Sequence, residues 1–356
     1  MASDGNTVGA IVESKECYLS AYAVQGVPTS DHIKFRTVAL PITADSIPEG
    51  HVAVKVLLIS VDPYLRTRMT GLAEGLNFSR FELNEVLKEY GIGRVIASRN
   101  DKYNEGDIVT NPYLPVAEYC VIPPDLLTTI DPASSSFSLP EYLSCLGVPG
   151  FTAWAGIEVL GDLKAGSNVF ISAAAGGVGM FAGQLAKLKG CRVIGSTGSD
   201  EKVKLIKEEL GYDDGFNYHK ETDFDVALTK YFPDGIDLYF DNVGGKMLEA
   251  VLNHVNHRAR ILLCGMVSQY NKVWTERDGV RNLLNAVGKE VRLEGFMLYS
   301  HLHRLPDFAR EMETYKKQGK IKSKHTLLHG IESFVEGFGS LFSSSNMGKV
   351  IVQVGS

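Results

Sequence analysis

The segment that most constrains the fold is a glycine-rich turn, Ala173 to Gly179, which reads AAAGGVG. It follows a short apolar run at 169–171 and precedes a helical pattern from Met180 to Lys189. Strand, tight turn and helix in this order form a pocket for a dinucleotide diphosphate, because glycines let the backbone approach the phosphates and the helix N-terminus favours negative charge. Since a single glycine-rich match is weak, its interpretation depends on the surrounding pattern.

From about residue 140 onward, short apolar strands alternate with helical patterns. The expected strands are 168–171, 191–196, 215–218, 236–240, 260–264 and 291–297, and the expected helices are 178–189, 200–210, 222–232, 244–254 and 280–288. Short apolar strands separated by helices predict an α/β fold with a parallel, doubly wound sheet. The glycine turn follows the first strand, where such a fold binds its nucleotide. We therefore expect a Rossmann-type domain at 140–305.

Residues 1–139 predict a second, β-rich domain of barrel type. Branched residues dominate 52–60 and 91–97, and Pro and Gly separate the expected short strands. The C-terminal residues 306–356 end in a strand-like run. We expect this tail to complete the β-rich domain, because the parallel sheet already has its strands.

An Asp-Pro step inside the β-rich region predicts a helix start. Asp62 is expected at the N-cap and Pro63 at the first helical position. This accounts for neither Tyr64 nor the arginines Arg66 and Arg68, which are candidates for a ligand-facing loop.

The composition of the 356 residues is that of an ordinary globular protein, with 44% hydrophobic and 22% charged residues. A net charge of −6 without basic clusters argues against nucleic-acid or anionic-membrane partners. Met1 to Gly5 show no signal-peptide pattern, and no apolar run reaches the roughly 18–20 residues of a membrane span, so a cytoplasmic protein is expected. The five cysteines are widely spaced without a C-x-x-C pair, which predicts reduced, mostly buried thiols.

The end of the second expected strand bears on the choice of nicotinamide cofactor. NAD-specific sites usually carry an acid there for the ribose 2′-hydroxyl, but residues 193–199 read VIGSTGS and the first acid is Asp200. Lys202 follows, and small hydroxyl residues with a lysine suit the 2′-phosphate of NADPH. In the structural alternative, Ser199 caps the next helix and Lys202 is a solvated helix residue. Tyr218, after the third strand, is either a further phosphate contact or plain core.

Eight segments in order carry a resemblance to a known family. They are 61–64 (VDPY), 148–153 (VPGFTA), 173–179 (AAAGGVG), 198–202 (GSDEK), 216–218 (FNY), 241–245 (DNVGG), 264–271 (CGMVSQYN) and 346–349 (NMGK). With them the sequence resembles the medium-chain dehydrogenase/reductase superfamily, and in particular its zinc-independent plant alkenal double-bond reductases and mammalian prostaglandin/leukotriene reductases. The resemblance implies a GroES-like domain at 1–139 and 306–356, a Rossmann NADP-binding domain at 140–305, and a homodimer.

The resemblance also implies which residues bind NADPH and substrate. The cofactor contacts fall on Pro63, Tyr64, Ala173, Ala174, Ala175, Gly176, Gly177, Val178, Gly179, Gly198, Lys202, Tyr218, Asn242, Cys264, Tyr270, Phe296, Met297, Leu298 and Asn346. Tyr64, Tyr90 and Tyr270 would border the substrate. Asn242 has a structural alternative, since 241–245 could simply be a strand-to-helix turn. One departure is that 111–119 lacks the tryptophans of flowering-plant relatives, which leaves the shape of the substrate pocket open.

The expected chemistry needs few protein groups and no metal. The first domain offers only Cys17, Cys120, His32 and His51, without metal-ligand spacing. In the reduction of a double bond conjugated to a carbonyl, hydride moves to the β-carbon, charge develops on the carbonyl oxygen, and a proton returns to the α-carbon.

Tyr270, near the end of the fifth strand, is the expected catalytic hydrogen-bond donor, directly or through the nicotinamide ribose hydroxyl. The alternatives are a zinc-independent NADPH quinone oxidoreductase and a non-catalytic nucleotide-binding protein.

Overall fold

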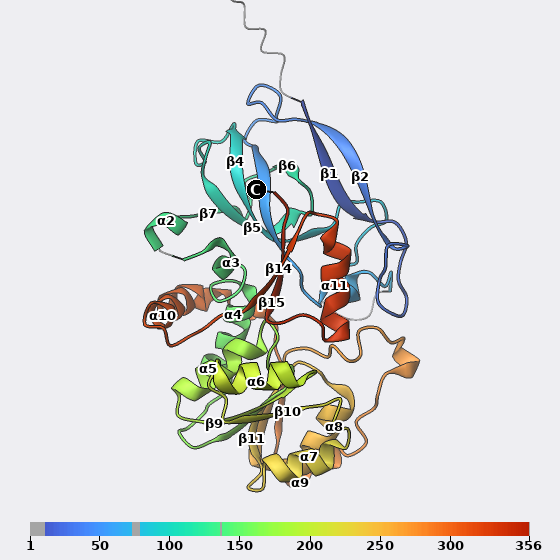
Figure 1. The fold of residues 1–356 in the computed structure, drawn as a ribbon, viewed down its shortest axis with the longest axis vertical. Coiled ribbons are helices and arrows are strands. Elements are labelled where there is room, and N and C mark those ends of the chain that lie inside the picture. Colours follow the sequence, from blue (N-terminus) through green and yellow to red (C-terminus); the bar gives the residue numbers. More distant parts are fainter. Residues whose placement is uncertain (1–10, 73–78, 136, 356) are drawn as a thin grey trace, which may run out of the picture. The chain divides into compact units, whose positions relative to one another are not determined.

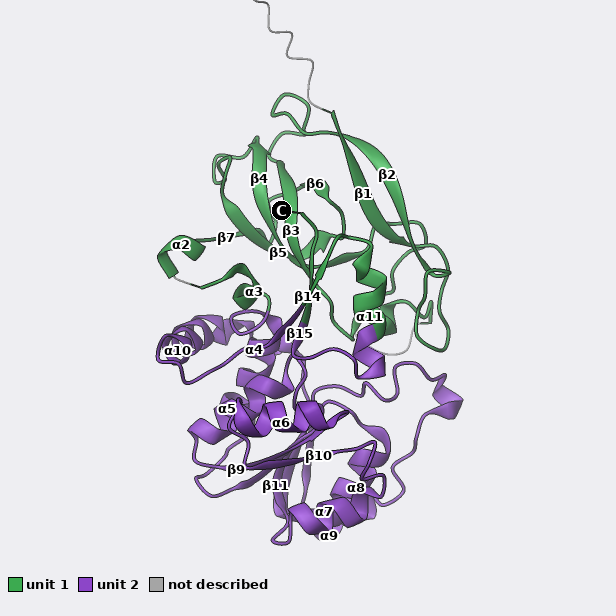
Figure 2. Ribbon diagram, viewed as in Figure 1, with its two compact units in different colours: residues 1–143, 327–339, 350–356 green, residues 144–326, 340–349 purple. Residues whose placement is uncertain are grey.

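The computed structural model describes residues 11–72, 79–135 and 137–355. Two compact units divide the chain: unit 1 is Met1–Leu143, Leu327–Gly339 and Val350–Ser356, and unit 2 is Ser144–Thr326 with Ser340–Lys349 (Figure 2). The residues Met1 to Gly5, which bear on a signal peptide, lie outside the described ranges. Within those ranges, no helix is both long and apolar enough to cross a membrane.

Unit 2 is built on a six-stranded parallel sheet (Figure 1). Its strands are β8 (Asn168–Ile171), β9 (Arg192–Thr197), β10 (Asp214–Asn217), β11 (Ile236–Asp241), β12 (Val255–Leu263) and β13 (Arg292–Gly295). They lie in the order β10-β9-β8-β11-β12-β13, and every neighbouring pair is parallel. This is the strand order of a dinucleotide-binding sheet, so the predicted doubly wound fold is confirmed.

Helices cover both faces of this sheet (Figure 1). They are α4 (Val148–Trp154), α5 (Gly179–Leu188), α6 (Asp200–Glu208), α7 (Phe224–Tyr231), α8 (Gly245–His254), α9 (Leu284–Gly288) and α10 (Leu305–Lys317), with a π-helical segment at Ala155–Leu160 and 3-10 turns at Trp274–Glu276 and Leu298–Arg304. Neighbouring side chains of β8 point to opposite faces of the sheet and pack in two different hydrophobic cores. Val169 and Ile171 pack with residues of α5 and α6, whereas Phe170 packs with residues of α7 and α8. Burial on both faces explains why these strands are continuously apolar.

Unit 1 is an antiparallel β structure. Its strands are β1 (Ile11–Leu19), β2 (Ile33–Pro41), β3 (Val52–Ser60), β4 (Lys88–Ser98), β5 (Ile108–Pro115), β6 (Tyr119–Ile122), β7 (Thr128–Ile130), β14 (His325–His329) and β15 (Lys349–Gln353). A seven-stranded sheet runs β14-β15-β3-β4-β5-β7, with β6 also paired to β3, and β1 pairs with β2. The helices are α1 (Leu65–Arg68), α2 (Pro132–Ser135), α3 (Leu139–Tyr142) and the first part of α11 (Ser333–Ser343), whose residues from Ser340 onward belong to unit 2.

The C-terminal residues divide between the units. β15 pairs antiparallel with β3 in the sheet of unit 1. Helix α10, which the sequence placed with the first domain, instead contributes Phe308 and Met312 to the core of unit 2. The Trp154 indole Nε1 also donates to Glu311 Oε2 at 2.8 Å. The apolar face of α10 therefore assigns this helix to unit 2.

The predicted helix start at Asp62 is wrong. Helix α1 begins at Leu65, with Tyr64 at the N-cap position and Pro63 in the preceding turn. The Asp62 carboxylate accepts a hydrogen bond from the hydroxyl of Ser60. Asp62 therefore forms a hydrogen bond with the last residue of β3 and does not cap a helix.

Candidate active site

The glycine turn connects β8 to α5 at the carboxyl end of the parallel sheet. Ala173 has φ +50°, and its carbonyl accepts from the Gly176 N–H at 2.9 Å. A Cβ at Gly179 would lie 2.4 Å from the Ala173 carbonyl oxygen, so only glycine fits there. Ala174 and Ala175 are buried, and the backbone continues through Gly176, Gly177 and Val178, which are partly exposed residues. Such backbone at a helix N-terminus suits a phosphate group.

Three polar residues meet beyond the ends of β9 and β10. The Lys202 ammonium donates to the carbonyl oxygen of Ser344 at 2.9 Å, and the hydroxyl oxygens of Tyr218 and Ser344 lie 2.6 Å apart. A Cβ at Gly198 would lie 2.5 Å from Ser344 Oγ and 2.8 Å from the Tyr218 oxygen. Glycine at 198 therefore leaves the space that these groups fill. Sequence reasoning grouped Gly198, Lys202 and Tyr218 but missed Ser344, which lies in a run of three serines typical of a loop.

Lys202 is a buried cation, not the solvated helix residue of the structural alternative. It is 9% exposed, and burial lowers its pKa below 10.5. In the part of the chain that the structure describes, Lys202 forms no ion pair, and the nearby Asp200 is paired with Lys220. Ser199 does cap α6, by accepting from the Lys202 backbone N–H at 3.2 Å. A buried ammonium without a carboxylate partner is costly, and an anionic ligand would supply the missing charge.

A buried network joins the carboxyl ends of β8 and β11. Asp241 Oδ1 accepts from the Tyr239 hydroxyl at 2.7 Å and from the backbone N–H groups of 243–244 at 2.8 Å. Asn242 donates from Nδ2 to the Ser172 carbonyl at 2.8 Å and from its backbone N–H to the Ser172 hydroxyl at 3.0 Å. Burial raises the pKa of Asp241. The Asn242 side chain thus takes part in the strand-to-helix turn, and its contact with a cofactor stays a prediction.

Tyr270 lies in the turn that follows β12, not on the strand itself. Its hydroxyl oxygen accepts from the Met266 backbone N–H at 3.2 Å and lies 3.1 Å from the position of a Cβ on Gly265. Because this oxygen accepts there, its own O–H can donate to another group. Burial raises the pKa of Tyr270 to about 12, so the hydroxyl keeps its proton at neutral pH.

The other predicted residues of unit 2 are Cys264, Phe296, Met297, Leu298 and Asn346. Cys264 follows β12, and burial raises the pKa of its thiol to about 12, so it is neutral. Phe296 to Leu298 lead from β13 into a 3-10 turn, and the Phe296 ring stands edge-on to Phe240 with 6.1 Å between centroids. Asn346 is buried, and its Nδ2 donates to the Gly348 carbonyl at 3.2 Å.

The predicted residues of unit 1 gather around a buried glutamate that sequence reasoning missed. Glu89 is 2% exposed, and its Oε1 accepts from the Tyr64 hydroxyl at 3.1 Å and from the Tyr90 backbone N–H at 2.7 Å. Burial and the charge of Glu89 raise the pKa of Tyr64, and burial raises that of Tyr90. Pro63 precedes Tyr64 in the same turn. Tyr64 and Tyr90 therefore share one partner in unit 1, whereas Tyr270 belongs to unit 2.

Among the described residues, neither metal-binding side chains nor cysteine thiols form a further candidate site. Within residues 11–72, 79–135 and 137–355, no group of three or more His, Cys, Asp or Glu side chains is arranged to hold a metal ion. All five cysteines are free thiols, and four of them are buried, as predicted.

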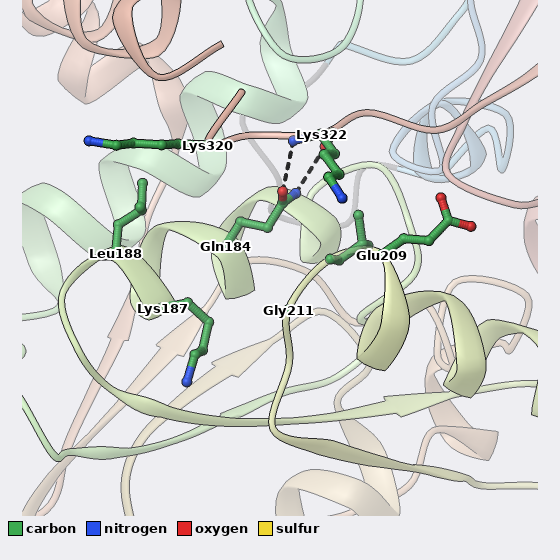
Figure 3. Close-up of a pocket in the computed structure, with 8 residues that line it drawn as sticks. Gln184, Lys187, Leu188, Glu209, Gly211, Lys320 and Lys322 are labelled. Carbon is green, nitrogen blue, oxygen red and sulfur yellow. Dashed lines mark hydrogen bonds between the residues drawn. The ribbon is translucent and has the colours of Figure 1, made fainter. Parts of the chain in front are cut away.

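A hollow of about 210 Å³ lies beside the C-terminal half of α5. It is lined by Gln184, Lys187, Leu188, Glu209, Leu210, Gly211, Lys320 and Lys322. The Gln184 side chain holds the backbone of Lys322 through hydrogen bonds of 2.8 and 2.9 Å (Figure 3). The ammonium groups of Lys187, Lys320 and Lys322 point in different directions (Figure 3), and Lys187 is paired with Asp213 at 2.8 Å. This hollow contains none of the predicted site residues, and we assign it no function.

The chain is similar to known oxidoreductases. Residues 177–314 match the family model of zinc-binding dehydrogenases, and residues 15–130 match that of an N-terminal domain of oxidoreductases. An NADP(+)-dependent 2-alkenal reductase of Nicotiana tabacum is 40% identical over 96% of this chain and 98% of its own, and (+)-pulegone reductase of Mentha piperita is 38% identical over 97% and 99%. The crystal structure of CurA from Vibrio vulnificus in complex with NADPH has a TM-score of 0.87 at 32% identity, covering 96% of this chain and 99% of that one.

Proposed function

The chain belongs to the medium-chain dehydrogenase/reductase family, and on that premise we propose that it uses NADPH to reduce the α,β carbon–carbon double bond of conjugated enals and enones. The observation that carries the cofactor assignment is the buried Lys202 ammonium, which donates to the Ser344 carbonyl and has no carboxylate partner among the described residues. The acceptor class is supported by the two plant relatives, a 2-alkenal reductase and a pulegone reductase.

The residues present fit NADPH. The backbone of the partly exposed residues 176–178, at the N-terminus of α5, would hold the diphosphate. The ammonium of Lys202 and the hydroxyl of Tyr218 would hold the 2′-phosphate, with Gly198 leaving the space that Tyr218 and Ser344 occupy. When bound, NADPH supplies the hydride that reaches the β-carbon of the acceptor.

Tyr270 is the proposed donor to the carbonyl oxygen of the substrate, where negative charge develops. Its raised pKa keeps the O–H protonated across the physiological range, and the Met266 N–H fixes the position of its oxygen. A fixed donor aimed at a developing oxyanion stabilises the transition state more than the ground state.

Tyr64 and Tyr90 are the proposed substrate contacts of unit 1. Glu89 binds the hydroxyl of Tyr64 and the backbone of Tyr90, so it would hold both tyrosines in place. The Tyr64 hydroxyl donates to this carboxylate, so we assign it a role in orienting the substrate and not in proton transfer.

The test is a screen of NADPH oxidation with product identification. The acceptors are a lipid-derived enal such as 4-hydroxy-2-nonenal, a phenylpropanoid aldehyde, a benzalacetone-type ketone, a cyclic enone and a quinone. A saturated aldehyde or ketone as product supports the proposal, whereas an allylic alcohol shows C=O reduction. Turnover of the quinone alone would identify a quinone oxidoreductase, and binding of NADPH without turnover of any acceptor would identify a non-catalytic protein.

The reaction is proposed to be zinc-independent, because the described residues offer no cluster of three metal-binding side chains. A homodimer is proposed from exposed apolar side chains near the edge strand β13, where Leu284 is 77% and Val287 75% exposed. We also propose that the protein is located in the cytoplasm, which cell fractionation would test.

A further inference from the structure

Ser344 follows the last residue of α11 and adopts a left-handed backbone conformation, with φ +59°. Helices often end with one residue in this conformation, and that residue is usually glycine. A serine there is strained, because its Cβ crowds the backbone in a way that glycine avoids. Strain of this kind persists where the surrounding structure or the function requires the side chain.

The side chain of Ser344 points to a functional requirement. Its hydroxyl lies 2.6 Å from the Tyr218 hydroxyl, and its carbonyl accepts from the Lys202 ammonium at 2.9 Å. Ser344 is therefore in contact with both groups that are proposed to hold the 2′-phosphate. The segment that carries it is anchored to unit 2, because the Gly348 N–H donates to the Ala175 carbonyl at 2.9 Å, next to the glycine turn.

A capping role alone does not explain this arrangement. Glycine would end α11 without strain, and it would keep the backbone carbonyl that accepts from Lys202. What glycine would lack is the hydroxyl, which contacts the Tyr218 hydroxyl in the space left by Gly198. The serine hydroxyl therefore explains why a strained residue occupies this position in place of glycine.

We propose that Ser344 is a third donor to the 2′-phosphate of NADPH, beside Lys202 and Tyr218, and so determines the preference for NADPH over NADH. On binding, the hydroxyls of Ser344 and Tyr218 exchange their mutual hydrogen bond for one bond each to a phosphate oxygen, and the Ser344 carbonyl holds the Lys202 ammonium in place. This inference rests on the proposed use of NADPH.

The test measures binding of two small probes by calorimetry, adenosine 2′,5′-bisphosphate and 5′-AMP, which differ only in the 2′-phosphate. The proteins are the wild type, Ser344→Gly, Ser344→Ala and Lys202→Met. Ser345→Ala is the matched control, since Ser345 is an exposed neighbour whose hydroxyl bonds to Ser343 at 2.9 Å. Thermal unfolding of the same proteins without ligand provides an independent readout.

Both Ser344 variants should raise the Kd of adenosine 2′,5′-bisphosphate about tenfold, because they lose one hydrogen bond to a charged group. The Kd of 5′-AMP should not change. Ser344→Gly should also raise Tm by about 1–2 °C, because it relieves the strain, whereas Ser344→Ala should not.

If Lys202→Met raises the Kd of the bisphosphate but both Ser344 variants bind it with the wild-type Kd, the proposed role of Ser344 is overturned. The proposed use of NADPH then still stands. If wild type binds the two probes equally, both are overturned.

Discussion

Replacing Lys202 with methionine isolates the charge on which the proposed cofactor site depends. Lys202 is 9% exposed, so the substitution must preserve packing. Methionine keeps an unbranched, flexible chain of similar length and removes only the ammonium. Because a buried ammonium without a carboxylate partner stabilises the fold little or not at all, the cofactor-free variant should fold as well as the wild type.

The expected effect on NADPH follows from the lost contact with the 2′-phosphate. A hydrogen bond to a charged group contributes about 1.5–3 kcal/mol, and each 1.4 kcal/mol is about tenfold in Kd. The Kd of NADPH should therefore rise about 10- to 140-fold in Lys202→Met. NADH has no 2′-phosphate, so its Kd should not change.

Fluorescence titration with both cofactors over a range of pH measures this difference. Burial lowers the pKa of Lys202 below 10.5, so wild type should lose NADPH affinity as alkaline pH rises through that lowered pKa. The variant should show no such loss, and NADH affinity should be flat in both proteins. Melting of the cofactor-free proteins controls for folding. If the variant binds NADPH with the wild-type Kd, or if its affinities for NADPH and NADH fall equally, the assignment of Lys202 to the 2′-phosphate is refuted.

Three further predictions concern catalysis, pH and assembly. Tyr270→Phe should lower kcat with a 2-alkenal at saturating NADPH about 100-fold, since it removes one oxyanion donor; an unchanged kcat would exclude Tyr270. Burial raises the pKa of Asp241 above 3.8, so the folded protein binds this proton more tightly, and the free energy of unfolding should fall as pH rises from 3.8 through the raised pKa. Asp241→Asn should remove that dependence in urea unfolding, and an identical pH profile would contradict it. Leu284→Glu with Val287→Glu should convert the proposed dimer to monomers in light scattering, and a monomeric wild type would contradict the dimer.

The fold could be predicted because local patterns and connection rules both specify it. Short strands with branched side chains, separated by helices, leave few topologies other than a doubly wound sheet. Boundaries were less accurate where polar residues interrupt a strand. β12 begins at Val255, before the predicted start at residue 260, because Asn256, His257 and Arg258 are polar and Arg258 has φ +62°.

The candidate site was predictable only where its residues follow strand ends. Gly198, Lys202 and Tyr218 come directly after β9 and β10, so their proximity follows from the parallel sheet. Ser344 is contributed by the tail, and no local pattern marks its φ or its contact with Tyr218. Glu89 is visible in the sequence as a charge within a strand, but its contact with Tyr64 depends on tertiary structure.

Lys202 and Ser344 together suggest how such sites can be recognised. One is a buried cation without a carboxylate partner among the described residues, and the other is a serine in a conformation suited to glycine. Lys202 contributes little or nothing to the stability of the cofactor-free protein and Ser344 lowers it, while a single bound anion would interact with both. Binding then returns stability as RT ln(1 + [L]/Kd), about 2.7 kcal/mol at 100 times Kd. A stability assay without cofactor would therefore rank Lys202→Met as neutral and Ser344→Gly as an improvement, and only the comparison of NADPH with NADH would reveal what each substitution removes.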